Sequence, residues 1–269
     1  GVYAHLDLFD AIDWGLIIYD EVHLLPAPIF RFTADIQSRR RLGLTATLVR
    51  EDGMEGEVFS LIGPKRFDVP WKEIESQGYI APADCVEVRV NLTDDERLNY
   101  ATAEQEDRYR YCSTTLTKHR VAIALANKHK DEQVLVIGQY LDQLDRLSEE
   151  LGVPIIKGDT PIKERERLFE LYRTGELKCL VVSKVANFSV DLPDATIAIQ
   201  VSGTFGSRQE EAQRLGRILR PKSDGRTARF YSIVARDTID QDFAQNRQRF
   251  LAEQGYAYQI IDADEILSA

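Results

Sequence analysis

The sequence predicts an α/β fold in which a parallel sheet is flanked by helices. In the C-terminal half, short apolar runs of strand length alternate with segments of helical periodicity, a pattern typical of βαβ units. Near the N-terminus, carboxylates and hydroxyls directly follow two apolar runs, and the carboxyl ends of parallel strands are where such sheets bind ligands. The chain has 269 residues, 43% hydrophobic and 29% charged, which suits one large globular domain or two ordinary ones.

Two strands are predicted near the N-terminus. Residues 14–19 form an apolar run that ends at a pair of carboxylates, and residues 42–47 form a second run. The arginine-rich stretch between them, residues 30–41, has the pattern of a helix. Two strands are too few for a complete α/β domain, so we expect the chain to begin inside a domain.

The middle of the chain is expected to connect two domains. We assign residues 1–72 to the C-terminal part of a first domain, 73–90 to a connector and 91–262 to a second domain. Prolines and glycines in residues 63–83 favour the connector. The charge-dense residues 91–117 predict either a helical hairpin that projects from the fold or an ordinary solvated helical face.

The second domain has the pattern of alternating strands and helices. The predicted strands are residues 134–137, 154–156, 180–183, 197–201 and 230–234, and the predicted helices are residues 141–151, 162–173, 209–219 and 239–253. Thr160 and Pro161 stand where an N-cap and a first-turn proline would open the helix over residues 162–173.

Charge, cysteine content and hydropathy exclude several classes of protein. The net charge of −10 argues against a uniformly basic nucleic-acid-binding surface but allows a local basic groove. Three widely spaced cysteines argue against a disulfide framework and favour a cytoplasmic location. The four histidines form no HxxxH pair, so a histidine-based metal site is unsupported. No apolar run approaches the roughly 18 residues that span a membrane, and no membrane partner is expected.

The first chemical motif is Asp-Glu-Val-His at residues 20–23, after the first predicted strand. A carboxylate there can hold Mg²⁺ through water, and an adjacent carboxylate can orient the water that attacks a γ-phosphate. The same pair can also be a simple helix cap. The next strand ends at Thr45 and Thr47, whose hydroxyls can bond a neighbouring carboxylate or simply favour β structure.

A second motif is Gln-Arg-Leu-Gly-Arg-Ile-Leu-Arg at residues 213–220. On a helix, Gln213, Arg217 and Arg220 share one face. Two arginines on one face can supply guanidinium groups to the phosphates as the transition state spreads its charge. The alternative is a solvated basic helix, but Gly216 inside a helix costs about 1 kcal/mol, which favours close approach of another group.

Residues 20–23, 45–47 and 213–220 resemble, in this order, motifs II, III and VI of superfamily 2 helicases. The intervening sequence is similar to the xeroderma pigmentosum group B (XPB) family of DNA repair helicases, and the likeness covers nearly the whole chain through residues 20–27, 42–52, 62–65, 183–185, 191–193, 213–220, 230–232, 237–238, 247–248 and 254–256. The resemblance implies a complete second RecA-like domain, the C-terminal part of a first, ATP with Mg²⁺, and 3′–5′ movement on DNA without sequence preference.

The resemblance also implies roles for single residues. Asp20 would hold magnesium through water, Glu21 would be the hydrolytic base, and Arg217 and Arg220 would complete the catalytic set. The residues implied in ATP binding or coupling are His23, Gln213, Asp191, Thr45 and Thr47. Those implied in DNA binding or unwinding are Arg50, Glu51, Asp52, Lys163, Arg165, Ser183 and Lys184. Residues 91–117 occupy the place of the family's thumb insertion.

One part of a helicase motor is missing from this sequence. The phosphate-binding loop has the pattern GxxxxGK[ST], and none of the 16 glycines is followed by lysine. We therefore expect a C-terminal fragment of an ATP-dependent DNA helicase that does not hydrolyse ATP by itself at a useful rate. Two alternatives are a non-enzymatic module that binds DNA or a partner such as a nuclease, and the motor subunit of a restriction-type enzyme.

Overall fold

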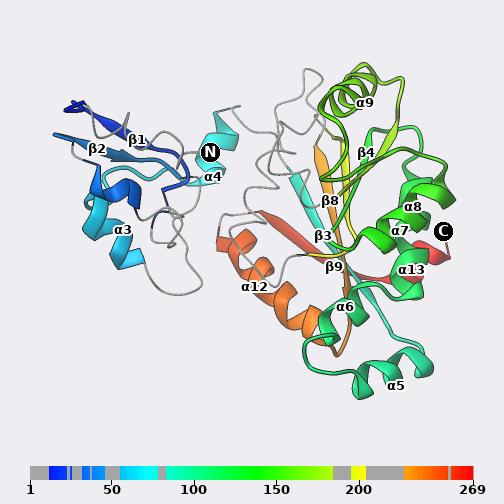
Figure 1. Ribbon diagram of the computed structural model, residues 1–269. Coiled ribbons are helices and arrows are strands. Elements are labelled where there is room, and N and C mark those ends of the chain that lie inside the picture. Colours follow the sequence, from blue (N-terminus) through cyan, green and yellow to red (C-terminus); the bar gives the residue numbers. More distant parts are fainter. Residues whose placement is uncertain are drawn as a thin grey trace. The chain divides into compact units, whose positions relative to one another are not determined.

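The described residues of the computed structural model fall into nine ranges: 12–22, 25, 32–36, 38–45, 55–77, 83–183, 195–203, 227–253 and 256–268. The chain forms two compact units, Gly1–Val69 and Pro70–Ala269, whose elements are labelled in Figure 1. The boundary between them lies slightly before the one expected after residue 72. Within the described residues, no helix is both long enough and apolar enough to cross a membrane.

The first unit contains two short parallel strands, as predicted. Its described elements are β1 (Ile17–Tyr19), the 3-10 helix η3 (Phe32–Asp35), β2 (Arg41–Gly43) and α3 (Glu55–Ile62). The prediction of a helix over residues 30–41 is wrong for the second half of that range. Ser38 already forms a parallel bridge with Trp14, because the chain must be extended there to enter β2.

The second unit contains a seven-stranded sheet with the strand order β5-β6-β4-β7-β8-β3-β9. Every neighbouring pair of strands is parallel, which confirms the predicted fold class. The strands are β3 (Ala83–Val90), β4 (Val134–Gly138), β5 (Ile155–Ile156), β6 (Cys179–Ser183), β7 (Ile197–Gln200), β8 (Ala228–Ala235) and β9 (Ala257–Asp262).

Strand β3 is the largest departure from the sequence-based prediction. Its residues fall in the connector expected over 73–90, yet β3 pairs with β8 on one side and β9 on the other. Glu87 and Arg89 give this segment a polar appearance, but they satisfy each other, because Arg89 Nε donates to Glu87 Oε1 at 2.7 Å. The hydroxyl of Tyr258 on β9 donates to the other oxygen of Glu87. A strand that is paired on both sides therefore carries an ion pair.

Helices cover both faces of this sheet. The described helices of the second unit are α4 (Trp71–Ser76), α5 (Asp94–Thr102), α6 (Arg108–Ser113), α7 (Leu116–Lys128), α8 (Leu141–Leu151), α9 (Ile162–Thr174), α12 (Ile239–Glu253) and α13 (Ala263–Leu267). Leu135 and Ile137 of β4 pack in the cluster that includes residues of α9 and α12, whereas Val134 and Val136 pack with α7, α8 and α13. Figure 1 shows α12 on one side of the sheet and α7, α8 and α13 on the other.

The start of α9 differs in detail from the prediction. Pro161 is itself the N-cap, with φ −55° and ψ 142°, and no side chain caps the helix. The hydroxyl of Thr160 is engaged in the preceding turn, where it accepts the backbone N–H of Lys157 at 2.8 Å. The predicted bounds of α8 and α12 coincide with the observed ones, while the helix predicted over 209–219 lies outside the described residues.

Candidate functional site

Backbone hydrogen bonds hold the carboxyl ends of β1 and β2 together. The N–H of Leu44 donates to Tyr19 O at 2.8 Å, and the N–H of Val22 donates to Leu44 O at 3.0 Å. Val22 is buried there because position 43 is glycine; a Cβ at Gly43 would lie 2.8 Å from Val22 Cγ2. The hydroxyl of Tyr19 donates to Thr33 O at 2.7 Å, and burial raises the pKa of Tyr19, so the hydroxyl keeps its proton at neutral pH.

This pairing gathers Asp20, Glu21 and Thr45 at one end of the two strands. Asp20 is exposed, and its Oδ1 accepts the backbone N–H of Glu21 at 2.9 Å. Glu21 has φ +50°, a left-handed conformation that is uncommon for residues other than glycine and is often found at functional sites. Three residues predicted to serve ATP chemistry therefore lie at the carboxyl edge, where α/β sheets bind ligands.

A magnesium ion fits this edge only as a partner of phosphate groups. Within the described residues, no group of three or more histidine, cysteine, aspartate or glutamate side chains is placed to hold a metal ion. Magnesium that travels with a nucleotide needs only one or two protein carboxylates, since phosphate oxygens and waters complete its shell. The exposed carboxylate of Asp20 suits that role.

The second unit brings the described DNA-contact candidates to the carboxyl edge of its own sheet. Ser183 ends β6, and the strand register places it beside Gly138, the last residue of β4. The loop after β5 leads into α9, which carries Lys163 and Arg165. Because all these strands are parallel, the three candidates share one edge of the sheet.

Lys163 and Arg165 occupy different environments. Lys163 is exposed, whereas Arg165 is only 8% exposed. Nη2 of Arg165 lies 3.4 to 3.5 Å from the carbonyl oxygens of Lys157, Gly158 and Thr160. Arg165 therefore braces the loop before α9, and of these two residues Lys163 is the one that presents its charge to solvent.

Gln139 and Ser202 also belong to this edge, although the sequence pattern did not single them out. The backbone N–H of Gln139, after β4, donates to Ser202 Oγ, after β7, at 2.8 Å. This bond joins the loops of two adjacent strands. The position of Ser202 directly after an apolar run was the one signal in the sequence for this contact.

Ser183 is 1% exposed, and its hydroxyl has no hydrogen-bond partner among the residues that the structure describes.

The remaining candidates lie outside the described residues, and their roles stay predictions. They are His23, Thr47, Arg50, Glu51, Asp52, Lys184, Asp191, Gln213, Arg217 and Arg220. The described candidates thus form two groups, one at the strand ends of each unit.

Residues 91–117 contain α5 and α6, which differ in burial. None of the residues of α5 is buried, as expected for a solvated face. In α6, by contrast, Tyr109, Cys112 and Ser113 are buried. Only the first helix of this region therefore has the burial expected for a solvated helical face.

Glu96 anchors α5 to the start of α7. Its carboxylate accepts the backbone N–H of Thr93 at 3.0 Å and the hydroxyl of Thr117 at 2.8 Å. Burial by itself would raise the pKa of Glu96, but hydrogen bonds from Thr93 and Thr117 outweigh that effect and lower the pKa. A lowered pKa in the folded state stabilises the protein above the unfolded pKa, and this stabilisation is lost as the pH falls through the folded value.

Glu96→Gln should therefore unfold at a lower temperature than the parent chain at pH 7. The difference should shrink as the pH is lowered below the ordinary value of 4.5, because the parent carboxylate then becomes protonated as well. Thermal unfolding followed by circular dichroism across this pH range measures the effect. Glu106→Gln, at an exposed position, is the matched control, and a difference for Glu96→Gln that persists undiminished in acid would contradict the assignment.

Comparison with known proteins identifies the family. The model of the ERCC3/RAD25/XPB C-terminal helicase matches residues 74–268. The chain is 72% identical over 266 residues to the DNA 3′-5′ helicase XPB of Kineococcus radiotolerans, covering 99% of this chain and 48% of that protein. It is 70% identical over 267 residues to the DNA 3′-5′ helicase XPB of Mycobacterium tuberculosis, covering 99% and 49%. The chain thus spans about half the length of these curated relatives.

Comparison with solved structures supports the fold described above. A structure of S. cerevisiae Dbp5 bound to RNA and ADP BeF3 superposes with a TM-score of 0.63 at 15% identity, over 94% of this chain and 61% of that chain. At this identity the likeness shows the fold alone, and that fold is the parallel sheet with helices on both faces described above. From the match over residues 74–268 and the high identity to its relatives, the chain belongs to the ERCC3/RAD25/XPB C-terminal helicase family.

Proposed function

We propose that the intact protein is an ATP-dependent DNA helicase or translocase of superfamily 2, with 3′–5′ polarity and a role in DNA repair. One observation carries the proposal: in a chain of this family, Asp20, Glu21 and Thr45 meet at the carboxyl ends of two paired parallel strands. Because this sequence lacks GxxxxGK[ST], the activity is that of a longer protein that supplies a phosphate-binding loop.

In the hydrolytic step, we assign the water to Glu21 and the metal to Asp20. The Glu21 carboxylate takes a proton from the attacking water. The water oxygen bonds to the γ-phosphorus, and the bond between the γ-phosphorus and the leaving ADP oxygen breaks. Asp20, exposed beside it, would hold Mg²⁺ through water. When bound, magnesium supplies positive charge to the phosphate oxygens. Thr45 lies at the end of the neighbouring strand, where its hydroxyl can couple the carboxylates to β2.

Arg217 and Arg220 are assigned to the developing charge on the transferred phosphoryl group. A guanidinium is permanently charged and matches phosphate oxygens in geometry, so the two arginines complete the catalytic set. DNA is held through its phosphates without sequence preference. Lys163, exposed at the carboxyl edge, supports this part of the proposal better than Arg165, whose guanidinium braces a loop.

Four other expectations differ in the support that they have. The identity to DNA 3′-5′ helicases disfavours a restriction-type motor subunit. A binding module is the second candidate for the chain without its phosphate-binding loop. Nothing in the described residues supports a nuclease partner. The cytoplasmic location that we propose is supported by three free cysteines, Cys85, Cys112 and Cys179.

Arg217→Ala in the intact protein should lower the rate of DNA-stimulated ATP hydrolysis by about 10³-fold or more, the usual effect of losing an arginine finger. Affinity for single-stranded DNA should stay within about twofold, because the contacts with DNA phosphates are assigned to other residues. A coupled ATPase assay and fluorescence anisotropy measure the two quantities. Arg173→Ala, which removes an exposed arginine paired with Glu170 on α9, is the control. Loss of DNA binding with normal hydrolysis would reverse the assignment.

In the intact protein, Glu21→Gln should bind ATP with little change in affinity and fail to turn it over, because the amide cannot accept the proton of the attacking water. Binding of a fluorescent ATP analogue and single-turnover hydrolysis test the two halves separately. Glu57→Gln on α3, in the same unit, is the matched control. Normal turnover by Glu21→Gln would remove this residue from the hydrolytic step.

A further inference from the structure

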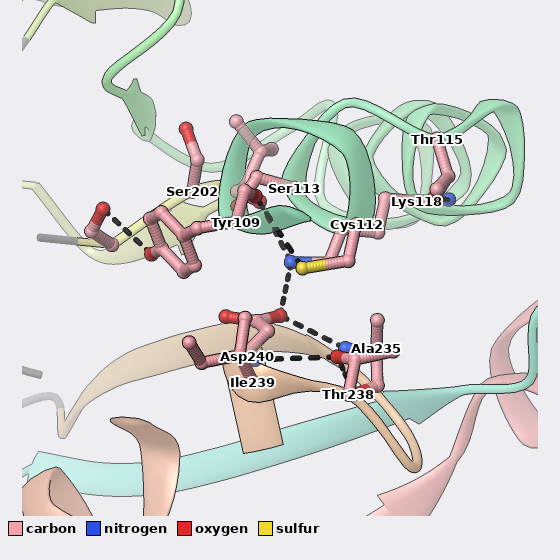
Figure 2. A network of polar contacts seen from close by, with 12 residues as sticks. Tyr109, Cys112, Ser113, Thr115, Lys118, Ser202, Ala235, Thr238, Ile239 and Asp240 are labelled. Carbon is pink, nitrogen blue, oxygen red and sulfur yellow. Dashed lines mark hydrogen bonds and ion pairs between the residues drawn. The ribbon is translucent and has the colours of Figure 1, made fainter. Parts of the chain in front are cut away.

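A buried ion pair lies at the carboxyl end of β7 and includes no residue assigned to ATP or DNA. It joins Lys118 on α7 to Asp240 on α12, whose side chains are 0% and 1% exposed. Lys118 Nζ lies 2.6 Å from Asp240 Oδ2, and Figure 2 shows the ammonium group pointing directly at the carboxylate.

The ion pair also binds the backbone of two adjacent strands. Lys118 Nζ donates to the carbonyl oxygen of Val201 at 3.3 Å, directly after β7. Asp240 Oδ2 accepts the backbone N–H of Ala235 at 2.9 Å, and Ala235 is the last residue of β8. Two helices are therefore tied to the carboxyl ends of neighbouring strands through a single pair of charges.

A third side chain bonds to the same stretch of chain slightly later. The hydroxyl of Tyr109 on α6 donates to Gly203 O at 2.8 Å. Burial and the nearby Asp240 carboxylate raise the pKa of Tyr109, so its hydroxyl keeps its proton and remains a donor. The Tyr109 ring packs edge-on against Phe243, with 5.0 Å between ring centroids. Phe243 lies on α12, so the helix that carries Asp240 also supports Tyr109.

The space around Gly203 leaves little freedom for this part of the chain. A Cβ at position 203 would lie 3.1 Å from Nη1 of the buried Arg247 and 2.7 Å from Nε2 of Gln200. The chain therefore leaves β7 through a narrow passage lined by α12 and by β7 itself.

Stability alone is a poor explanation for the ion pair. Burying an ammonium and a carboxylate is costly, and replacing such a pair with apolar side chains is often neutral or stabilising. Asp240 Oδ1 is also buried and has no hydrogen-bond partner among the described residues, so the network is only partly satisfied. The distinctive effect is directional: Lys118 orients the carbonyl group of Val201, and Tyr109 orients that of Gly203, at the exit from a strand.

We propose that Tyr109, Lys118 and Asp240 form a positioning clamp at the exit of β7. From Gly203 the chain continues into the segment that carries the arginine motif at residues 213–220. The clamp sets the point and direction of departure, and thereby the placement of the arginines on the phosphates. This inference rests on the proposed function, in which none of the three residues is assigned a contact with ATP.

The mildest test removes one hydroxyl from the intact protein. Tyr109→Phe keeps the ring against Phe243 but loses the bond to Gly203, and kcat for DNA-stimulated ATP hydrolysis should fall about tenfold, since a shift of about 1 Å can lower a rate by about 10²-fold. The KM for ATP, the DNA affinity and the melting temperature should stay near those of the parent. Tyr111→Phe, on the same helix and only half-buried, should leave kcat unchanged.

A second variant removes the ion pair without leaving a buried charge. Lys118→Met/Asp240→Leu preserves most of the side-chain volume and strands neither charge, so its melting temperature should lie above that of Lys118→Met, while kcat again falls about tenfold, through the same loss of placement. Lys118→Met alone strands a buried carboxylate, so its melting temperature should fall. The double variant therefore separates positioning from folding.

The outcomes distinguish the clamp from the function on which it rests. An unchanged kcat in Tyr109→Phe and in the double variant, beside an inactive Arg217→Ala, would overturn the clamp and leave the helicase assignment standing. A fall in kcat matched by losses of DNA affinity and melting temperature would show a merely structural role and would also overturn the clamp. An intact parent protein without DNA-stimulated turnover would overturn the proposed function and the clamp together.

Discussion

Parallel strand pairing is the constraint on which the rest of the molecule depends. When every strand of a sheet runs the same way, every strand ends at the same edge, and residues far apart in sequence are brought together there. In the first unit this edge gathers Asp20, Glu21 and Thr45. In the second it gathers the ends of β4, β6, β7 and β8, with Ser183 and Ser202 among them. The chemistry proposed for the protein is placed by this geometry.

The elements that the sequence predicted well are those whose apolar pattern is undisturbed. Strand β4 is buried throughout, and α8 carries apolar residues on one face between a strand and a glycine C-cap. Strand β3 was missed because Glu87 and Arg89 interrupt its apolar pattern, and only their mutual contact and that with Tyr258 make them compatible with burial. Such pairing depends on tertiary contacts, which a local pattern does not contain.

The candidate site shows the same division. The motif at residues 20–23 and the strand end at Thr45 could be recognised because residue type and position coincide with strand ends. Arg165 was assigned to DNA by its resemblance, yet its guanidinium bonds to carbonyl groups of the preceding loop. Lys118 is an unremarkable lysine in a helical pattern, and its role emerges only because Asp240 lies opposite it across the fold.

The central claim is that this chain holds one set of catalytic groups and needs a phosphate-binding loop from outside its sequence. The direct measurement is the rate of DNA-stimulated ATP hydrolysis by the 269-residue chain, beside that of a version extended upstream to include GxxxxGK[ST]. We predict turnover in the extended protein and none above background in the chain alone. Substantial turnover by the chain alone, or none by either protein, would contradict the claim.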